Sequence, residues 1–189
     1  MKRISILITL SLLIASTALF AQMSGVSTEK STIKWTGSKV GGSHNGSLQL
    51  KEAKLDMHDN HLHGGQFTID MTSIVNLDIK KKKNKTKLEN HLKSDDFFGV
   101  ASFPEAVLKI TEEASFKDGV AHIHADLTIK GKTHPVHFEA KKDGKKITAT
   151  IKVDRSKYNV RYGSKSFFDN LGNKMIDNEF VIEVSLSLI

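Results

Sequence analysis

From Ser31 onward, apolar and polar residues alternate in short segments that are separated by turn residues. A period of two is typical of antiparallel strands that bury one face and expose the other to water. The pattern therefore predicts an all-β chain. The apolar positions that we expect to point inward are Leu48 and Leu50; Phe67, Ile69 and Met71; Ala106, Leu108 and Ile110; Ala121, Ile123, Ala125, Leu127 and Ile129; Val136, Phe138 and Ala140; Ile147, Ala149, Ile151 and Val153; and Phe180, Ile182, Val184, Leu186 and Leu188.

About eight such strands, regular turns and few prolines indicate a closed barrel or a sandwich, of which we favour the barrel. An eight-stranded barrel is either filled by its own side chains or wide enough to hold one small ligand. The stretch between residues 76 and 98 is the one helix candidate, with Thr86 as the cap of a short helix through Leu88, His91 and Leu92. The prediction is an all-β, eight-stranded antiparallel β-barrel with a short helical insertion.

The chain opens differently, with two basic residues, an uncharged apolar run over residues 4–20 and the small residue Ala21. This order is that of a secretory signal peptide, and the run is too short and too early for a comfortable transmembrane helix. We expect cleavage after Ala21, with cleavage after Ala18 as the alternative. Residues 1–21 are then the signal peptide, and residues 22–189 form one domain that is periplasmic or secreted.

The amino-acid composition excludes some kinds of site and some partners. The chain has no cysteine, which excludes disulfides and zinc sites built on thiolates. The formal net charge is +7, and much of it is local, because six lysines lie between positions 80 and 87. We interpret this cluster as a solvated surface ahead of a specific binding patch, with contact to an anionic membrane surface as the alternative and no nucleic-acid partner.

Histidine pairs suggest a metal site at first sight. His61 and His63 project from one face of a strand, and so do His122 and His124. A turn at residues 131–132 would place Asp126 opposite His137 and His124 opposite Glu139, so that each histidine gains a carboxylate neighbour. This pairing explains the polar stripe without a metal, and we predict neither a metal nor a cofactor.

Several segments, taken in order, resemble the YceI-like family of exported proteins. The likeness runs from about Ser31 to the C-terminus, and it rests on the combination of segments rather than on one motif. The segments are Ile33–Gly37, Gly42–Gly46, Gly64–Ile74, His91–Phe98, Phe103–Pro104, Leu127–Thr133 and Asp154–Tyr158.

The resemblance implies an elongated, lipocalin-like eight-stranded barrel in the periplasm that encloses a polyisoprenoid or other long-chain lipid, in a family without an agreed enzymatic activity. Apolar inward stripes suit a packed core and a lipid cavity equally, and the resemblance favours the cavity. The apolar residues that we expect to contact the ligand are Trp35, Leu48, Phe67, Ile69, Met71, Leu92, Phe97, Phe98, Phe103, Leu108, Leu127, Val136, Phe138 and Tyr158.

Two polar side chains complete the predicted ligand site. His44 shares a strand face with Leu48, and we expect it to point inward, where it binds either a head group or, slightly favoured, a buried side chain. Arg155 follows Asp154 at a strand end, and its guanidinium suits an anionic head group or a structural ion pair equally well.

These features favour a lipid carrier over two rivals. One rival is an enzyme that acts on an isoprenoid-type lipid, with His44 or Arg155 near the reactive head. The other is an interaction module without a ligand tunnel that docks to membranes through its lysines. The sequence contains no nucleophile elbow, zinc-binding helix or paired-carboxylate motif, so we predict no catalytic residues and no enzymatic activity.

Overall fold

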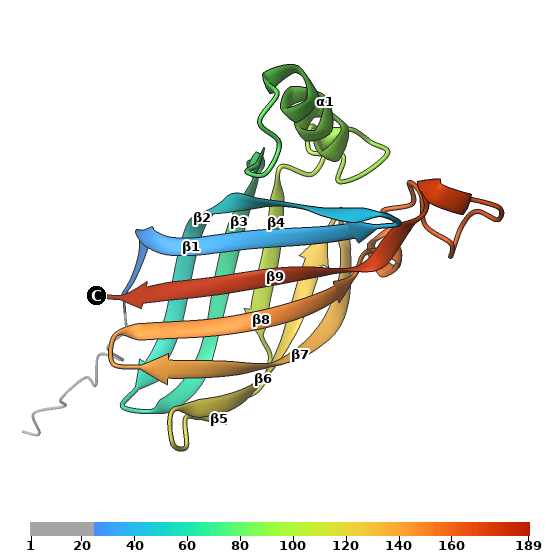
Figure 1. Ribbon diagram of the computed structural model, residues 1–189. Coiled ribbons are helices and arrows are strands. Elements are labelled where there is room, and N and C mark those ends of the chain that lie inside the picture. The colour runs from blue at the N-terminus through green and yellow to red at the C-terminus, as the bar shows by residue number, and fades with distance from the viewer. Residues whose placement is uncertain (1–24) are drawn as a thin grey trace, which may run out of the picture.

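The computed structural model describes residues 25–189, and it shows a closed, eight-stranded antiparallel β-barrel (Figure 1). The predicted signal peptide and its cleavage site at Ala21 lie outside the described residues. The elements are β1 (Val26–Lys39), β2 (Gly42–His58), β3 (His61–Asn76), α1 (Lys82–Lys93), β4 (Glu105–Ile110), β5 (Ala114–Ser115), β6 (Val120–Ile129), β7 (Lys132–Asp143), β8 (Lys146–Asp154), the 3-10 turns η1 (Arg155–Tyr158) and η2 (Gly172–Lys174), and β9 (Ile176–Leu188).

The barrel closes through hydrogen bonds between neighbouring strands all the way round. The strand order is β2-β1-β9-β8-β7-β6-β4-β3, and β3 pairs back with β2. The short β5 adds to the beginning of β3 and is not a wall of the barrel. This arrangement confirms the predicted fold and leaves no free edge among the long strands.

Alternation along the strands builds the interior. On β6, Ala121, Ile123 and Leu127 are buried, while His122 between them is exposed. The same alternation on the other strands lines the inside of the barrel with aliphatic and aromatic side chains. Thr68 lies between Phe67 and Ile69, at a position where the alternation predicts exposure to water, but it is buried although it does not line the interior cavity.

The β6–β7 hairpin keeps its apolar residues on the predicted face, but its two strands pair in a different register from the predicted one. Its turn consists of Lys130 and Gly131, both with positive φ, as the tight hairpin turn that fits the twist of two strands requires. The resulting cross-strand pairs are His122–Glu139, His124–His137 and Asp126–Pro135. The predicted pairs of Asp126 with His137 and of His124 with Glu139 are therefore wrong by two positions, a shift that leaves every apolar residue on its predicted face.

Helix α1 lies beyond the end of the barrel at which β3 ends and β4 begins (Figure 1). We call this end of the barrel the α1 end. The opposite end contains the β2–β3 turn and β5, and we call it the hairpin end. The helix begins at Lys82, more than a turn earlier than predicted, so Thr86 lies within it and is not its cap. The residue at the cap position is Lys81, which makes no side-chain capping hydrogen bond. Leu92 is buried beneath the helix. Within residues 25–189, no helix is long and apolar enough to cross a membrane.

Buried polar groups fasten α1 to the barrel. The fully buried Asn76 side chain donates hydrogen bonds to the main-chain oxygen of Asn45 at 3.0 Å and to Asp78 Oδ1 at 2.6 Å. Its main-chain N–H donates to Glu89 Oε1 on α1 at 2.8 Å. These bonds join the beginning of β2, the end of β3 and the helix, and they hold the helix in place over the barrel.

Candidate functional site

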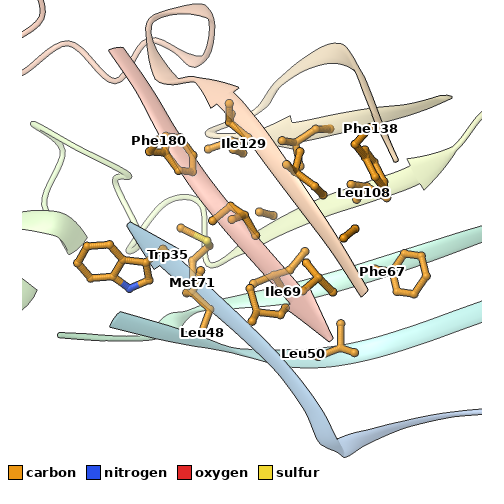
Figure 2. A pocket seen from close by; sticks show the side chains of 18 of the residues that line it. Trp35, Leu48, Leu50, Phe67, Ile69, Met71, Leu108, Ile129, Phe138 and Phe180 are labelled. Atoms are coloured by element: carbon orange, nitrogen blue, oxygen red, sulfur yellow. The ribbon is translucent and has the colours of Figure 1, made fainter. Parts of the chain in front are cut away.

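The barrel encloses a cavity of about 200 Å³ (Figure 2). All eight barrel strands contribute to its lining, as do α1 and the segment that follows α1. An apolar cavity of roughly 150 Å³ in another protein stays free of water and takes up benzene, so this space is large enough for an apolar ligand. The barrel is therefore not filled by its own side chains.

Twelve of the sixteen predicted site residues line this cavity, and their contact with a ligand stays a prediction. These residues are Trp35, Leu48, Phe67, Ile69, Met71, Leu92, Phe97, Phe98, Leu108, Leu127, Phe138 and Arg155. Figure 2 labels many of them around one continuous space. The sequence did not assign Ile74, Phe116 or Asp177 to the ligand site, although these residues also line the cavity.

Three of the predicted residues pack elsewhere. Val136 is buried in the wall without reaching the cavity, and Tyr158, the last residue of η1, is buried with its ring 5.2 Å from that of His134. Burial raises the pKa of Tyr158 to about 12. Phe103 is half-buried and lies against Gly131 in the β6–β7 turn.

His44 does not point into the apolar interior, so this prediction is wrong. It lies near the beginning of β2, where β2 pairs with β1 but not with β3, and its side chain is 34% exposed. Its Nδ1 atom lies 2.8 Å from Oδ2 of Asp78. The ring therefore contributes to the polar contacts that fasten α1 and not to the cavity.

Arg155 is buried at the α1 end of the cavity and is held by main-chain oxygens. Its Nε donates to Asp177 at 2.9 Å, Nη1 donates to Val160 at 2.8 Å and Tyr162 at 2.9 Å, and Nη2 donates to Ile176 at 3.0 Å. Neither alternative from the sequence, an ion pair or a head-group contact, accounts for these four bonds. Burial lowers the pKa of the guanidinium, while Asp154 and Asp177 raise it.

The lining of the cavity is apolar almost throughout, and its two charged residues lie at the α1 end. Of the residues that line it, Arg155 and Asp177 carry charged side chains, and both lie next to the loop between β8 and β9. The rest of the lining, from there to Leu62 and Phe116 at the hairpin end, is apolar except for glycine and the indole of Trp35. Asp177 is an exposed residue, and main-chain oxygens take up four of the N–H groups of Arg155, so hardly any polar surface faces the cavity at this end.

An aromatic cluster lies at the α1 end of the cavity. The Phe97 ring lies 5.5 Å from that of Tyr162 and 6.3 Å from that of Phe98, which in turn lies 6.2 Å from Phe180. The guanidinium of Arg155 lies 5.9 Å from the centre of the Phe97 ring. This cluster joins the segment after α1 to the β8–β9 loop, and Phe97 and Phe98 are part of the cavity wall, as the sequence suggested.

A closed β-barrel with an enclosed apolar cavity is an architecture that holds small ligands. The YceI-like domain model matches residues 25–188, and the chain belongs to this family. The resemblance seen in the sequence is thereby confirmed.

Curated relatives match part of the chain. A UPF0312 protein of Pseudomonas putida strain W619 is 33% identical over 87 residues, which cover 42% of this chain and 45% of that protein. A UPF0312 protein of Shewanella denitrificans is 32% identical over 83 residues, which cover 40% of this chain and 44% of that protein. The matched region thus spans less than half the length of these relatives.

Solved structures show the same fold. BcnA of Burkholderia cenocepacia aligns with a TM-score of 0.69 at 20% identity, covering 86% of this chain and 98% of that one. A polyisoprenoid binding domain from Saccharophagus degradans, implicated in plant cell wall breakdown, aligns with a TM-score of 0.58 at 12% identity, covering 88% and 97%. At these identities the likeness extends to the fold alone.

Proposed function

We propose that this chain is an exported binding protein that holds a long-chain apolar ligand, a polyisoprenoid or related lipid, inside its barrel for transport or storage. The observation that carries the proposal is the cavity of about 200 Å³ with an apolar lining from every barrel strand. A protein of the same fold is described as a polyisoprenoid binding domain, which supports this ligand class. Enclosing such a chain stabilises it by roughly 0.8 kcal/mol per buried methylene.

The position of Arg155 is the basis for the orientation that we propose for the bound ligand. A guanidinium has five N–H donors, and main-chain oxygens occupy four of those on Arg155, which leaves one on Nη2 for an oxygen of a head group. We propose that the polar head of the ligand lies beside Arg155 at the α1 end. Its apolar chain then extends toward Leu62 and Phe116 at the hairpin end.

Mass spectrometry of organic extracts from the natively purified protein tests the ligand. We expect a polyisoprenoid or related long-chain lipid that is absent from extracts of an unrelated periplasmic protein purified in the same way. A protein whose extracts contain no lipid, and which takes up none of an added polyisoprenoid, would contradict the proposal.

Export is proposed from the signal-peptide pattern of residues 1–21. N-terminal sequencing of the protein from a periplasmic fraction checks it, and we expect a first residue at or near Gln22. A mature protein that retains Met1 would overturn the proposed localisation.

We also propose that the protein meets an anionic membrane surface with its α1 end. The lysines at positions 80–83 are all exposed on the segment that enters α1, at the end of the barrel where Arg155 lies. Each lysine near an anionic surface contributes roughly 1 kcal/mol to binding. Contact through this end would place Arg155 and the α1 end of the cavity next to the lipid from which a ligand is taken.

A further inference from the structure

The outer surface of the hairpin end carries two histidines and a glutamate that meet across different segments. His61 and His63 lie on β3 on either side of Leu62, so their rings face outward while Leu62 is buried and lines the cavity. Glu113 directly precedes β5, and the pairing of β5 with β3 sets Ser115 opposite His61. The pairing of two strands thus brings the Glu113 carboxylate to both rings.

The donor atoms of this cluster converge. Oε2 of Glu113 lies 3.1 Å from Nε2 of His61, and Oε1 lies 3.2 Å from Nδ1 of His63. The two rings are 4.5 Å apart between centroids, and the ligating atoms of the three residues all lie within 4.8 Å of one another. Two ligands of a tetrahedral ion at about 2.0–2.2 Å lie roughly 3.4 Å apart, so these exposed side chains need only a modest rearrangement to hold one.

Neighbouring groups support the same chemistry. Ser115 Oγ lies 2.7 Å from Nδ1 of His61, which orients the ring so that Nε2 faces the carboxylate. Such a second hydrogen bond on the ring accompanies most histidine ligands of metals. The ring of His58 lies 5.7 Å from that of His63, and its Nε2 atom is 3.6 Å from Asp56 Oδ1. A third imidazole is therefore available next to the first two.

We propose that His61, His63 and Glu113 bind a divalent late transition-metal ion, with Zn²⁺ as the reference ion. Two imidazole nitrogens and a carboxylate oxygen supply three ligands of a tetrahedral Zn²⁺ site, and water or His58 supplies the fourth. Imidazole also suits Cu²⁺ and Ni²⁺, whereas Mg²⁺ and Ca²⁺ take oxygen ligands and are not expected to bind. Within residues 25–189, this is the one group of three such side chains with ligating atoms so close together.

The location of the site gives the ion a structural consequence. It connects β3 to the segment that leads into β5, directly outside the part of the wall where Leu62 and Phe116 line the cavity. A ligand that binds the folded state and not the unfolded state raises the stability of the protein. The site lies on the outside of the barrel, so its occupation does not depend on the ligand proposed for the interior.

Isothermal titration of the metal-free protein, produced without a histidine tag, tests the proposal with ZnCl₂. We expect one Zn²⁺ per chain, and a melting temperature that rises with Zn²⁺ but not with the same concentration of Mg²⁺. His63→Gln and Glu113→Gln should each weaken Zn²⁺ binding by about tenfold or more, as loss of a metal-site partner commonly does. The three side chains are 39–63% exposed, so these changes leave the fold intact.

A histidine on another strand provides the matched control. His124 is 44% exposed, lies 3.6 Å from Glu112 and has its ring 4.5 Å from that of His137, so it resembles His63 in surroundings. His124→Gln should leave the affinity and stoichiometry for Zn²⁺ unchanged. Equal weakening in His124→Gln and His63→Gln, or binding well below one ion per chain, would show dispersed binding by surface histidines and would overturn the proposed site.

Discussion

At the scale of single residues, the contact between β1, β2 and β3 depends on a missing side chain. Trp35 on β1 pairs with Gly46 on β2, and its indole Nε1 donates to the main-chain oxygen of Val75 at 3.2 Å. A Cβ atom at position 46 would lie 1.8 Å from that oxygen and 2.5 Å from the indole ring. The close approach of these three strands is therefore possible only with glycine at this position.

Gly46→Ala should consequently be among the most destabilising single substitutions in the barrel. The backbone oxygen cannot move without disturbing the β2–β3 ladder, so we expect the free energy of unfolding to fall by about 3 kcal/mol or more. Gly64→Ala on β3 is the control, because its Cβ would meet nothing within 4 Å. Urea denaturation followed by circular dichroism measures both variants, and a similar small change in the two would show that the strands can separate at position 46 without cost.

Asp78 gives the α1 end a dependence on pH. Burial opposes ionisation of this carboxyl, but hydrogen bonds from the Asn45 main-chain N–H, the His44 ring and the Asn76 amide outweigh it and lower its pKa to about 2. A pKa that is lower in the folded state means that the ionised form stabilises the fold. This contribution is complete above the ordinary value of 3.8 and is lost as the pH falls toward 2.

Asp78→Asn should therefore be less stable than the parent protein at neutral pH and lose this difference in acid. We expect a deficit of about 1 kcal/mol at pH 7, since charge-assisted bonds at a partly exposed site are weakened by solvent. Denaturant unfolding at several pH values should show the deficit shrinking between pH 4 and pH 2. Asp143→Asn, an exposed change on the β7–β8 turn, serves as control, and a deficit that persists at pH 2 would contradict the assignment.

At the scale of elements, local alternation predicted the strands because side-chain direction in a strand has a period of two. It failed where the backbone departs from that period. Asp70 accepts hydrogen bonds from the N–H and hydroxyl of Thr72, and the β2–β3 pairing shifts register there. As a result Met71 and Ile74 both point inward, although their separation is odd. A bulge of this kind leaves no signal in a hydrophobic pattern.

The lysine-rich segment before and within α1 is an element with a testable role. Six of its residues between positions 80 and 87 are lysines, and all are exposed except Lys85, which is half-buried and lies 3.9 Å from Glu89. Four of them are consecutive, at positions 80–83. Replacing these four with glutamine should weaken binding to anionic vesicles by roughly 1 kcal/mol per lysine at low salt. Sedimentation with vesicles that contain phosphatidylserine, at two salt concentrations, measures the effect.

A matched charge change at the hairpin end is the control for this experiment. It replaces with glutamine the four lysines next to the β7–β8 turn, which are Lys141, Lys142, Lys145 and Lys146. These substitutions lower the net charge equally, but they lie at the other end of the barrel, so vesicle binding should change little. Equal losses in the two variants would assign membrane binding to net charge alone.

At the scale of the whole molecule, the sequence predicted the barrel and most of its lining, but not what lies at its two ends. His44 belongs to the part of β2 that pairs with β1 but not with β3, so the pattern alone assigned it to the wrong environment. Phe116 lies outside every long strand and reaches the cavity only because β5 pairs with β3. The ends of a barrel depend on tertiary pairing, which short-range patterns do not contain.

Substitutions in the interior can distinguish a barrel that holds a ligand from a barrel that is filled by its own side chains. Leu127 on β6 lines the cavity, and its neighbour Thr128 lies on the other face of the same strand. A tryptophan at position 127 adds volume without charge, so it fills empty space in a hollow barrel but must displace packed atoms in a filled one. Overpacking of a filled core costs about 1–3 kcal/mol.

Leu127→Trp should therefore abolish the copurification of lipid while the melting temperature stays close to that of the parent protein. Ile69→Trp, which enters the same cavity from β3, should give the same result, and Thr128→Trp should retain the lipid because its ring lies outside. Lipid content by mass spectrometry and thermal unfolding by circular dichroism are measured on the same preparations. A steep loss of stability in both interior variants, together with no lipid in the parent protein, would show a barrel that carries nothing, since the added rings would then have met a packed interior.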